Sequence, residues 1–157
     1  MLIRFVSTIA AMAALAVLLS VSAPARAADD GIVRVKSAYP LEETVARIRK
    51  DVAAKGITWF ADIDQQALAA KSGIALRPSR LLVFGNPALG TLFITARAEA
   101  GIDWPVRLLV HQDADGAVWA TWTDFKWIAA RHGIRDRDAE FATATGVVAS
   151  ITSTIRR

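Results

Sequence analysis

The sequence predicts a single α+β domain of two layers, in which helices pack on one face of a mostly antiparallel sheet. Three observations favour this class. An alternating segment at residues 31–38 precedes an amphipathic helical pattern, a hairpin signature occupies residues 105–123, and an apolar stripe at helical spacing closes the chain. No repeat, low-complexity tract or interdomain linker interrupts this order, so we expect the elements to share one core.

The first 27 residues have the pattern of an export signal. Arg4 supplies a positive charge, residues 10–21 form an apolar stretch, and Ala25-Arg26-Ala27 fits the small-x-small cleavage pattern. The alternative is an uncleaved membrane anchor, but the apolar stretch is shorter than the roughly 20 residues that a spanning helix needs. We therefore expect cleavage after Ala27, a periplasmic or secreted protein without stable membrane insertion, and one domain over residues 28–157.

The N-terminal half of this domain predicts two strand–helix pairs. Residues 31–38 alternate between apolar and charged side chains, as in a half-buried strand. The helix that Pro40 starts and Gly56 closes has acidic residues in its first turn and basic residues later, which suits the helix dipole. Residues 57–63 are rich in β-branched and aromatic side chains and predict a strand, and residues 65–72 predict a short helix.

A third strand over residues 80–84 leads into the stretch FGNPALGT. Asn86 is a preferred helix cap and Pro87 a preferred first helical residue, so we expect a helix from Pro87 to about Glu99. Gly90 then falls in the first turn, where glycine costs up to about 1 kcal/mol relative to alanine. Either close packing or a ligand near the backbone is expected to require its missing side chain.

The hairpin joins a strand at residues 105–112 to a strand at residues 117–123. A three-residue loop, 114–116, with its glycine left-handed, pairs Asp113 with Ala117 and makes one face of the hairpin apolar throughout. After the hairpin, a short helix ended by a glycine and a last helix from about residue 138 complete the order.

The opposite face of the hairpin carries large side chains that one layer of helices would leave uncovered. His111 lies directly opposite Trp119 in this register. Exposed tryptophan and leucine side chains on one surface indicate an interface, although loops or the N-terminal segment are an alternative cover. The expected interface residues, for self-association into a homodimer, are Leu109, His111, Trp119 and Thr121.

The composition excludes several classes of function. The chain has no cysteine and two histidines, His111 and His132, which excludes thiol chemistry and a three-histidine zinc site. Loss of Arg4 and Arg26 with the leader leaves 17 of the 19 basic residues against 15 acidic ones, a net charge too small to indicate nucleic-acid binding. We therefore expect no metal, no cofactor and no nucleic-acid partner.

Four segments together resemble a known family. They are AYPLEETVARIRKDVAAKGITWFADID, IALRPSRLLVFGNPALGT, IDWPVRLLVHQDADGAVW and ITSTI. They are similar to the domain-of-unknown-function family 302 (DUF 302), small bacterial α+β domains. The family commonly has Pro-Leu after the Gly-Thr of the turn, whereas Leu92 and Phe93 follow here. The resemblance implies a compact, two-layer, dimeric fold and brings no catalytic residues with it.

The turn after the third strand is the first candidate binding site. Free N–H groups at a helix start, with glycines that allow close approach, can hold an anion, although this turn lacks the Gly-Lys-Ser/Thr of a phosphate loop. Capping and packing are the structural alternative. The candidate ligand-binding residues for a small anion are Gly85, Asn86, Gly90, Thr91 and Arg80.

Two functions follow from these patterns. The first is an exported, non-enzymatic, homodimeric module that binds a ligand or a partner. The alternative is a small hydrolase or isomerase in which His111 acts as a base and the Asn86 turn stabilises an oxyanion or phosphate. The alternative requires the third strand to pair with the hairpin so that His111 and Asn86 come within reach of one reacting centre.

Overall fold

The computed structural model describes residues 30–156, and the predicted leader lies outside this range. The strands are β1 (Ile32–Lys36), β2 (Thr58–Asp64), β3 (Ser79–Gly85), β4 (Val106–Gln112) and β5 (Val118–Thr123). The helices are α1 (Leu41–Ala54), α2 (Gln65–Lys71), α3 (Pro87–Ala96), the 3-10 helix η1 (Ala98–Ile102), α4 (Phe125–His132) and α5 (Asp138–Ser153). Within residues 30–156, no helix has the length and apolar character needed to cross a bilayer.

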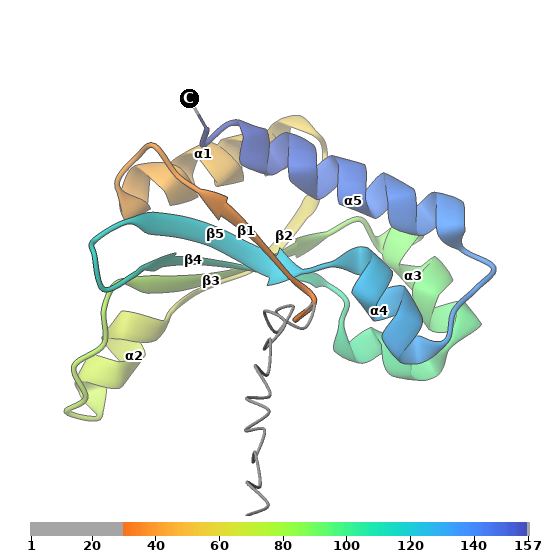
Figure 1. Cartoon of the computed structure of the whole chain (residues 1–157), viewed down its shortest axis with the longest axis horizontal. Helices are drawn as coiled ribbons and strands as arrows, with labels where there is room; N and C mark the ends of the chain where they lie inside the picture. The colour runs from red at the N-terminus through yellow and green to blue at the C-terminus, as the bar shows by residue number, and fades with distance from the viewer. Residues whose placement is uncertain (1–29, 157) are drawn as a thin grey trace, which may run out of the picture.

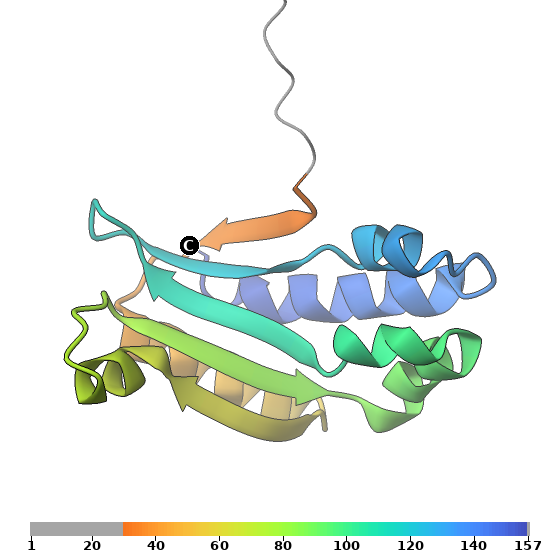
Figure 2. The same cartoon turned by 90° about the horizontal axis from the view of Figure 1, so that it is seen from below.

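The five strands form one antiparallel sheet in the order β1-β5-β4-β3-β2. Helices α1 and α5 lie across one face of this sheet (Figure 1). The view from below looks onto the opposite face, with α1 and α5 behind the strands (Figure 2). Helix α2 lies at one end of the sheet, and α3, η1 and α4 lie at the other (Figure 2). The predicted two-layer α+β class is thus confirmed.

The core lies between the sheet and these two helices. Leu108 and Val110 of β4 have no exposed surface, and their neighbours Leu82 of β3 and Ala120 of β5 are equally buried. Side chains of a strand alternate between its two faces, so the intervening residues of β4 point away from the helices. The buried residues that α1 and α5 add to this core include Ile48, Val52, Val148 and Ile151.

The hairpin has the predicted register. The Asp113 amide donates to the Ala117 carbonyl at 2.9 Å, and Gly116 has a φ of +81°, in the left-handed region. His111 pairs with Trp119 as expected. The turn chemistry and the apolar pattern therefore determined the pairing of β4 with β5.

Two local features differ from the expected strands and helices. Helix α3 ends at Ala96, before the predicted end near Glu99, because Arg97 is extended (φ −154°) and the chain re-enters a 3-10 turn that buries Ala100. In β2, the pairing with β3 shifts between Trp59 and Ala61, which leaves Phe60 as the extra residue of a β-bulge.

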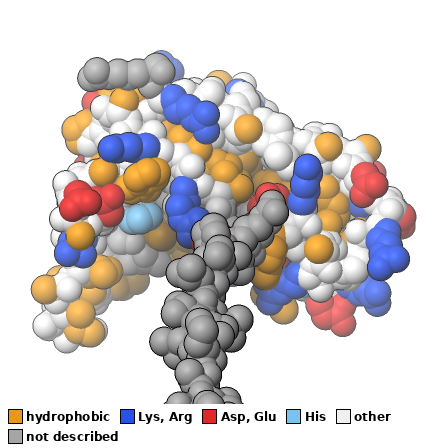
Figure 3. Space-filling view, in the orientation of Figure 1, with side chains coloured by type: hydrophobic (Ala, Val, Ile, Leu, Met, Phe, Trp, Pro, Cys, Tyr) orange, Lys and Arg blue, Asp and Glu red, His pale blue; other side chains and the backbone are white. Residues whose placement is uncertain are grey.

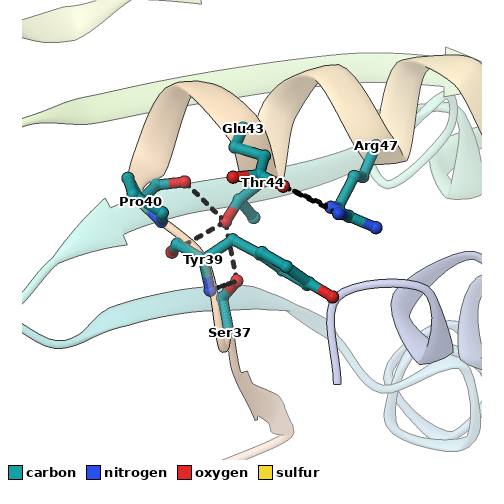
Figure 4. A network of polar contacts seen from close by, with 6 residues as sticks. All are labelled: Ser37, Tyr39, Pro40, Glu43, Thr44 and Arg47. Atoms are coloured by element: carbon teal, nitrogen blue, oxygen red, sulfur yellow. Dashed lines mark hydrogen bonds and ion pairs between the residues drawn. The ribbon is translucent and has the colours of Figure 1, made fainter. Parts of the chain in front are cut away.

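A buried polar network joins β1 to α1 (Figure 4). The Thr44 hydroxyl has no exposed surface and lies 2.9 Å from the Pro40 carbonyl and 2.6 Å from the Ser37 hydroxyl. The Ser37 oxygen accepts the Tyr39 amide at 3.1 Å. Each hydroxyl is satisfied if Thr44 donates to Pro40 and Ser37 donates to Thr44. The network fixes the angle at which the chain enters α1.

Thr44→Val is expected to lower the free energy of unfolding by about 1–3 kcal/mol, because it removes a buried partner of the Ser37 hydroxyl. Thr95→Val is the matched control, since the exposed Thr95 hydroxyl contacts only the Leu92 carbonyl of its own helix; its effect should stay within about 0.5 kcal/mol. Urea unfolding measures both. Equal effects would contradict the role given to Thr44.

Candidate functional site

The turn between β3 and α3 has the predicted cap. The Asn86 Oδ1 atom accepts the Leu89 amide at 3.2 Å, and Pro87 is the first helical residue. The Thr91 hydroxyl donates to the Pro87 carbonyl at 2.7 Å, so it is engaged within its own helix. The side-chain oxygen of Asn86 therefore caps the helix, and the residue as a whole is exposed.

Trp104 explains the glycines of this turn. A Cβ atom placed on Gly90 would lie 1.8 Å from Nε1 and Cε2 of the Trp104 indole, far inside contact distance, and one on Gly85 would lie 3.2 Å from Nε1. The indole also meets Phe60 edge-on, with ring centroids 6.0 Å apart. Close packing thus accounts for Gly90, and the indole occupies the position next to the Gly90 backbone where a ligand was the alternative.

A pocket of about 500 Å³ lies beside this turn. Its walls come from the end of β3, from α3, from α5 and from Trp104; α3 and α5 are adjacent in Figure 1. The deeply buried lining residues are all apolar, among them Phe84, Phe93, Ala144 and Val148. Gly85 and Asn86 line the same pocket, so two of the predicted ligand-binding residues lie at a cavity.

Three polar residues belong to the described pocket lining. They are Lys55, Asn86 and Thr143, and each is exposed. Lys55, the C-cap residue of α1, is the one ionisable residue among the described residues that line the pocket. Its Nζ atom lies 2.9 Å from Oδ2 of Asp51, one turn back on α1. The buried part of the pocket lining is therefore apolar, and its exposed part includes one cationic residue, Lys55.

Arg80 does not supply charge to the Asn86 turn, contrary to the sequence-based expectation. It lies near the start of β3, and its guanidinium is held by Asp62 (2.6 Å) and Glu42 (3.1 Å). The hydrogen bond to Asp62 is the main reason why the pKa of Arg80 is raised. No periodic pattern in the sequence indicated Lys55, which approaches the turn through the packing of α1 on the sheet.

His111 and the Asn86 turn lie at opposite ends of β3. Strand β3 does pair with β4, as the enzymatic alternative required, but His111 is opposite Ser79, the first residue of β3. Asn86 lies seven positions after Ser79 along an extended strand, a distance of about 23 Å at 3.3 Å per residue. Catalytic groups must lie within hydrogen-bond reach of one reacting centre, so the hydrolase or isomerase alternative loses its geometric basis.

The predicted interface residues lie on the open face of the sheet. Leu109, His111 and Trp119 are half-buried, and Thr121 is buried. The Trp119 indole N–H donates to Asp113 at 2.7 Å, and this bond is the main reason why the pKa of Asp113 is lowered. The Trp119 side chain is thus held by a hydrogen bond that the sequence pattern did not indicate.

Further apolar side chains extend this open face toward α2. Hydrophobic side chains gather over α2 at the lower left of the space-filling view (Figure 3). The exposed hydrophobic residues on this side of the molecule are Ile63 at the end of β2, Leu68 of α2, and Ile74 and Leu76 of the following loop. Contiguous apolar surface of this kind indicates an interaction site.

The second histidine belongs to a cluster of polar contacts around a buried carboxylate, which the sequence did not reveal. His132 of α4 lies 2.7 Å from the Asp103 carboxylate, which is 4% exposed and also pairs with Arg107 and Arg131. Buried charges require such partners. The cluster ties α4 and β4 to the residue that follows η1.

Gly90→Ala is expected to lower the free energy of unfolding by about 1–3 kcal/mol, because the added methyl group overlaps the Trp104 indole. Gly146→Ala is the control on α5, where a Cβ meets nothing within 4 Å. It should stabilise the protein by about 0.5–1 kcal/mol, since alanine is the better helix former. Thermal unfolding of both variants checks the opposite signs.

Two comparisons with known proteins name one family. The model of the family described as "Domain of unknown function DUF302" matches residues 33–153. A solved structure, of the uncharacterized conserved protein DUF302 from Bacillus stearothermophilus, superposes with a TM-score of 0.74 and 15% identity, covering 81% of this chain and 99% of that one. This likeness concerns the fold.

Longer relatives carry the name of an ion channel. The chain is 36% identical over 106 residues to the fluoride-specific ion channel FluC 1 of Brucella suis biovar 1 (strain 1330) and to that of Brucella abortus biovar 1 (strain 9-941). The match covers 68% of this chain but 42% and 39% of those proteins, so this chain spans about two fifths of their length. With the family model matched across most of its described residues, the chain belongs to the DUF302 family.

Proposed function

We propose that this protein is a non-enzymatic binding module that takes up a small apolar molecule in the pocket between α3 and α5. The observation that carries the proposal is the pocket itself, about 500 Å³ with an apolar interior. Small-molecule sites are typically concave, largely apolar, and roughly 300–1,000 Å³ in volume, with a few polar groups that fix orientation. Lys55, Asn86 and Thr143 are such groups here.

The pocket does not favour the ligand in the name of the channel relatives. Fluoride is a small, strongly hydrated anion, and an apolar interior offers no donors to replace its water. The module is therefore proposed to act on a larger, apolar ligand. Channel activity, which the name assigns to proteins more than twice the matched length, is not part of the proposal.

We further propose that a second copy of the chain covers the open sheet face. Five strands about 4.8 Å apart and about 20 Å long present roughly 500 Å² before α2 is added. A standard interface buries about 800 Å² per partner, so the sheet face alone supplies more than half of that area, and the exposed apolar residues around α2 add to it. Leu109 lies in the central strand of this face and is the proposed centre of the contact.

The location proposed for the module is outside the cytoplasm. The support is the charged, apolar and small-residue pattern of residues 1–27, which fits an export signal. The absence of cysteine means that folding there needs no disulfide formation.

Ligand uptake is tested with 1-octanol as a neutral apolar probe. We expect saturable shifts of the Trp104 indole N–H resonance, because Trp104 lines the pocket. Val147→Trp, which fills the pocket from α5, should abolish the shifts. Ala149→Trp places the same side chain on the exposed side of α5 and should leave them intact. Binding that survives Val147→Trp in a folded protein would refute the site.

Self-association is tested by sedimentation velocity over a range of concentrations. A dimer is expected, and Leu109→Glu should dissociate it, because an unpaired charge would be buried at the centre of the interface. Ile102→Glu is the control, since Ile102 is 60% exposed on η1, beyond the strand ends. A monomeric wild type, or a dimer unaffected by Leu109→Glu, would contradict the proposed surface.

A further inference from the structure

We infer that the ligand of the α3–α5 pocket is an acid-ended amphiphile, an apolar chain or ring system that carries one carboxylate held at Lys55. This inference rests on the proposed function and adds the chemical class of the ligand. It follows from how charge and burial are distributed along the pocket.

The buried and the exposed parts of the pocket lining differ in polarity. Its deep wall consists of side chains that are at most 6% exposed, including Phe93, Ala144 and Val148. Its polar lining residues, Lys55, Asn86 and Thr143, are all exposed and therefore lie where the pocket meets solvent. A ligand that matches this arrangement has an apolar body and a single polar end, and the polar end stays near water.

The charge at the mouth selects the kind of polar end. Lys55 is cationic, and no acidic residue belongs to the described lining. The first residues of α3, including Ala88, also line the pocket, and a helix start adds partial positive charge. An anion at the mouth is favoured by both, whereas an ammonium group would be repelled by both.

Asp51 competes for Lys55 and so sets the strength of the interaction. It is the one acidic side chain paired with Lys55 among residues 30–156, at 2.9 Å. An ammonium group has three N–H donors, so a contact with Asp51 leaves two for a ligand carboxylate. The Asp51 charge still lowers the positive potential that the ligand meets. Its removal is therefore expected to strengthen the binding of an acid.

The test compares octanoate with 1-octanol, which share the alkyl chain and differ in the end group, by calorimetry on the full chain. Lys55→Gln should weaken octanoate binding about fivefold and leave octanol binding within about twofold, the scale of a partly exposed ion pair. Asp51→Asn should tighten octanoate binding about two- to fivefold. Lys50→Gln, an exposed lysine of α1 outside the pocket lining, is the control and should change neither.

Two further readouts separate pocket binding from charge recognition. Affinity should rise about fourfold per added methylene from hexanoate onward until the pocket is full. The Lys55 effect should shrink in 1 M salt, where the screening length is about 3 Å, while the chain-length effect persists.

The outcomes distinguish this inference from the function on which it rests. Octanol binding with no loss of octanoate affinity in Lys55→Gln would overturn the acid-ended ligand and leave the apolar site standing. Failure of both probes to bind the wild type would overturn the proposed function together with the inference. Weakened octanoate binding in Lys55→Gln, with octanol unchanged, would support both.

Discussion

Helices α1 and α5 cover one face of the sheet, so the side chains of every strand fall into two sets, one facing the helices and one on the open face. Along β4, Leu108 and Val110 point into the core and have no exposed surface, whereas Leu109 and His111, which alternate with them, lie on the open face. Since alternation along a strand is fixed by backbone geometry, a register change of one residue would exchange the two sets. The composition of the core and that of the open face both depend on this register.

Trp104 connects the sheet to the end of the molecule where the pocket lies. Its indole rests on the backbone of Gly90 and Gly85, meets Phe60 from the side, and forms part of the pocket wall. Asp103, directly before it, is held by His132 and two arginines. The ion pairs of the buried Asp103 therefore hold the chain directly before the aromatic ring that lines the cavity, and residues distant in sequence act on the same site.

Local sequence patterns predicted those features that depend only on residues close together in the chain. The Asn86 cap, the hairpin register and the pairing of Asp113 with Ala117 follow from turn chemistry and apolar alternation. The sequence also indicated that Gly90 needed a reason. It did not show that Trp104 packs against Gly90, nor that Lys55 lies at the pocket. Both residues reach the turn only through tertiary packing. The ion pairs of Arg80 were missed for the same cause, since its partners come from α1 and β2.

The bulge at Phe60 has a consequence for how copies of this chain can assemble. The free edges of the sheet are β1, five residues long, and β2, whose ladder the bulge interrupts. Neither edge offers a long, regular row of N–H and C=O groups on which another chain's strand could grow. When two sheets stack face to face, each covers the other's open face and the assembly stops at two copies. Edge-to-edge addition of strands, in contrast, can continue into fibres. The geometry therefore permits a finite assembly and discourages polymerisation, even with apolar surface left in solvent.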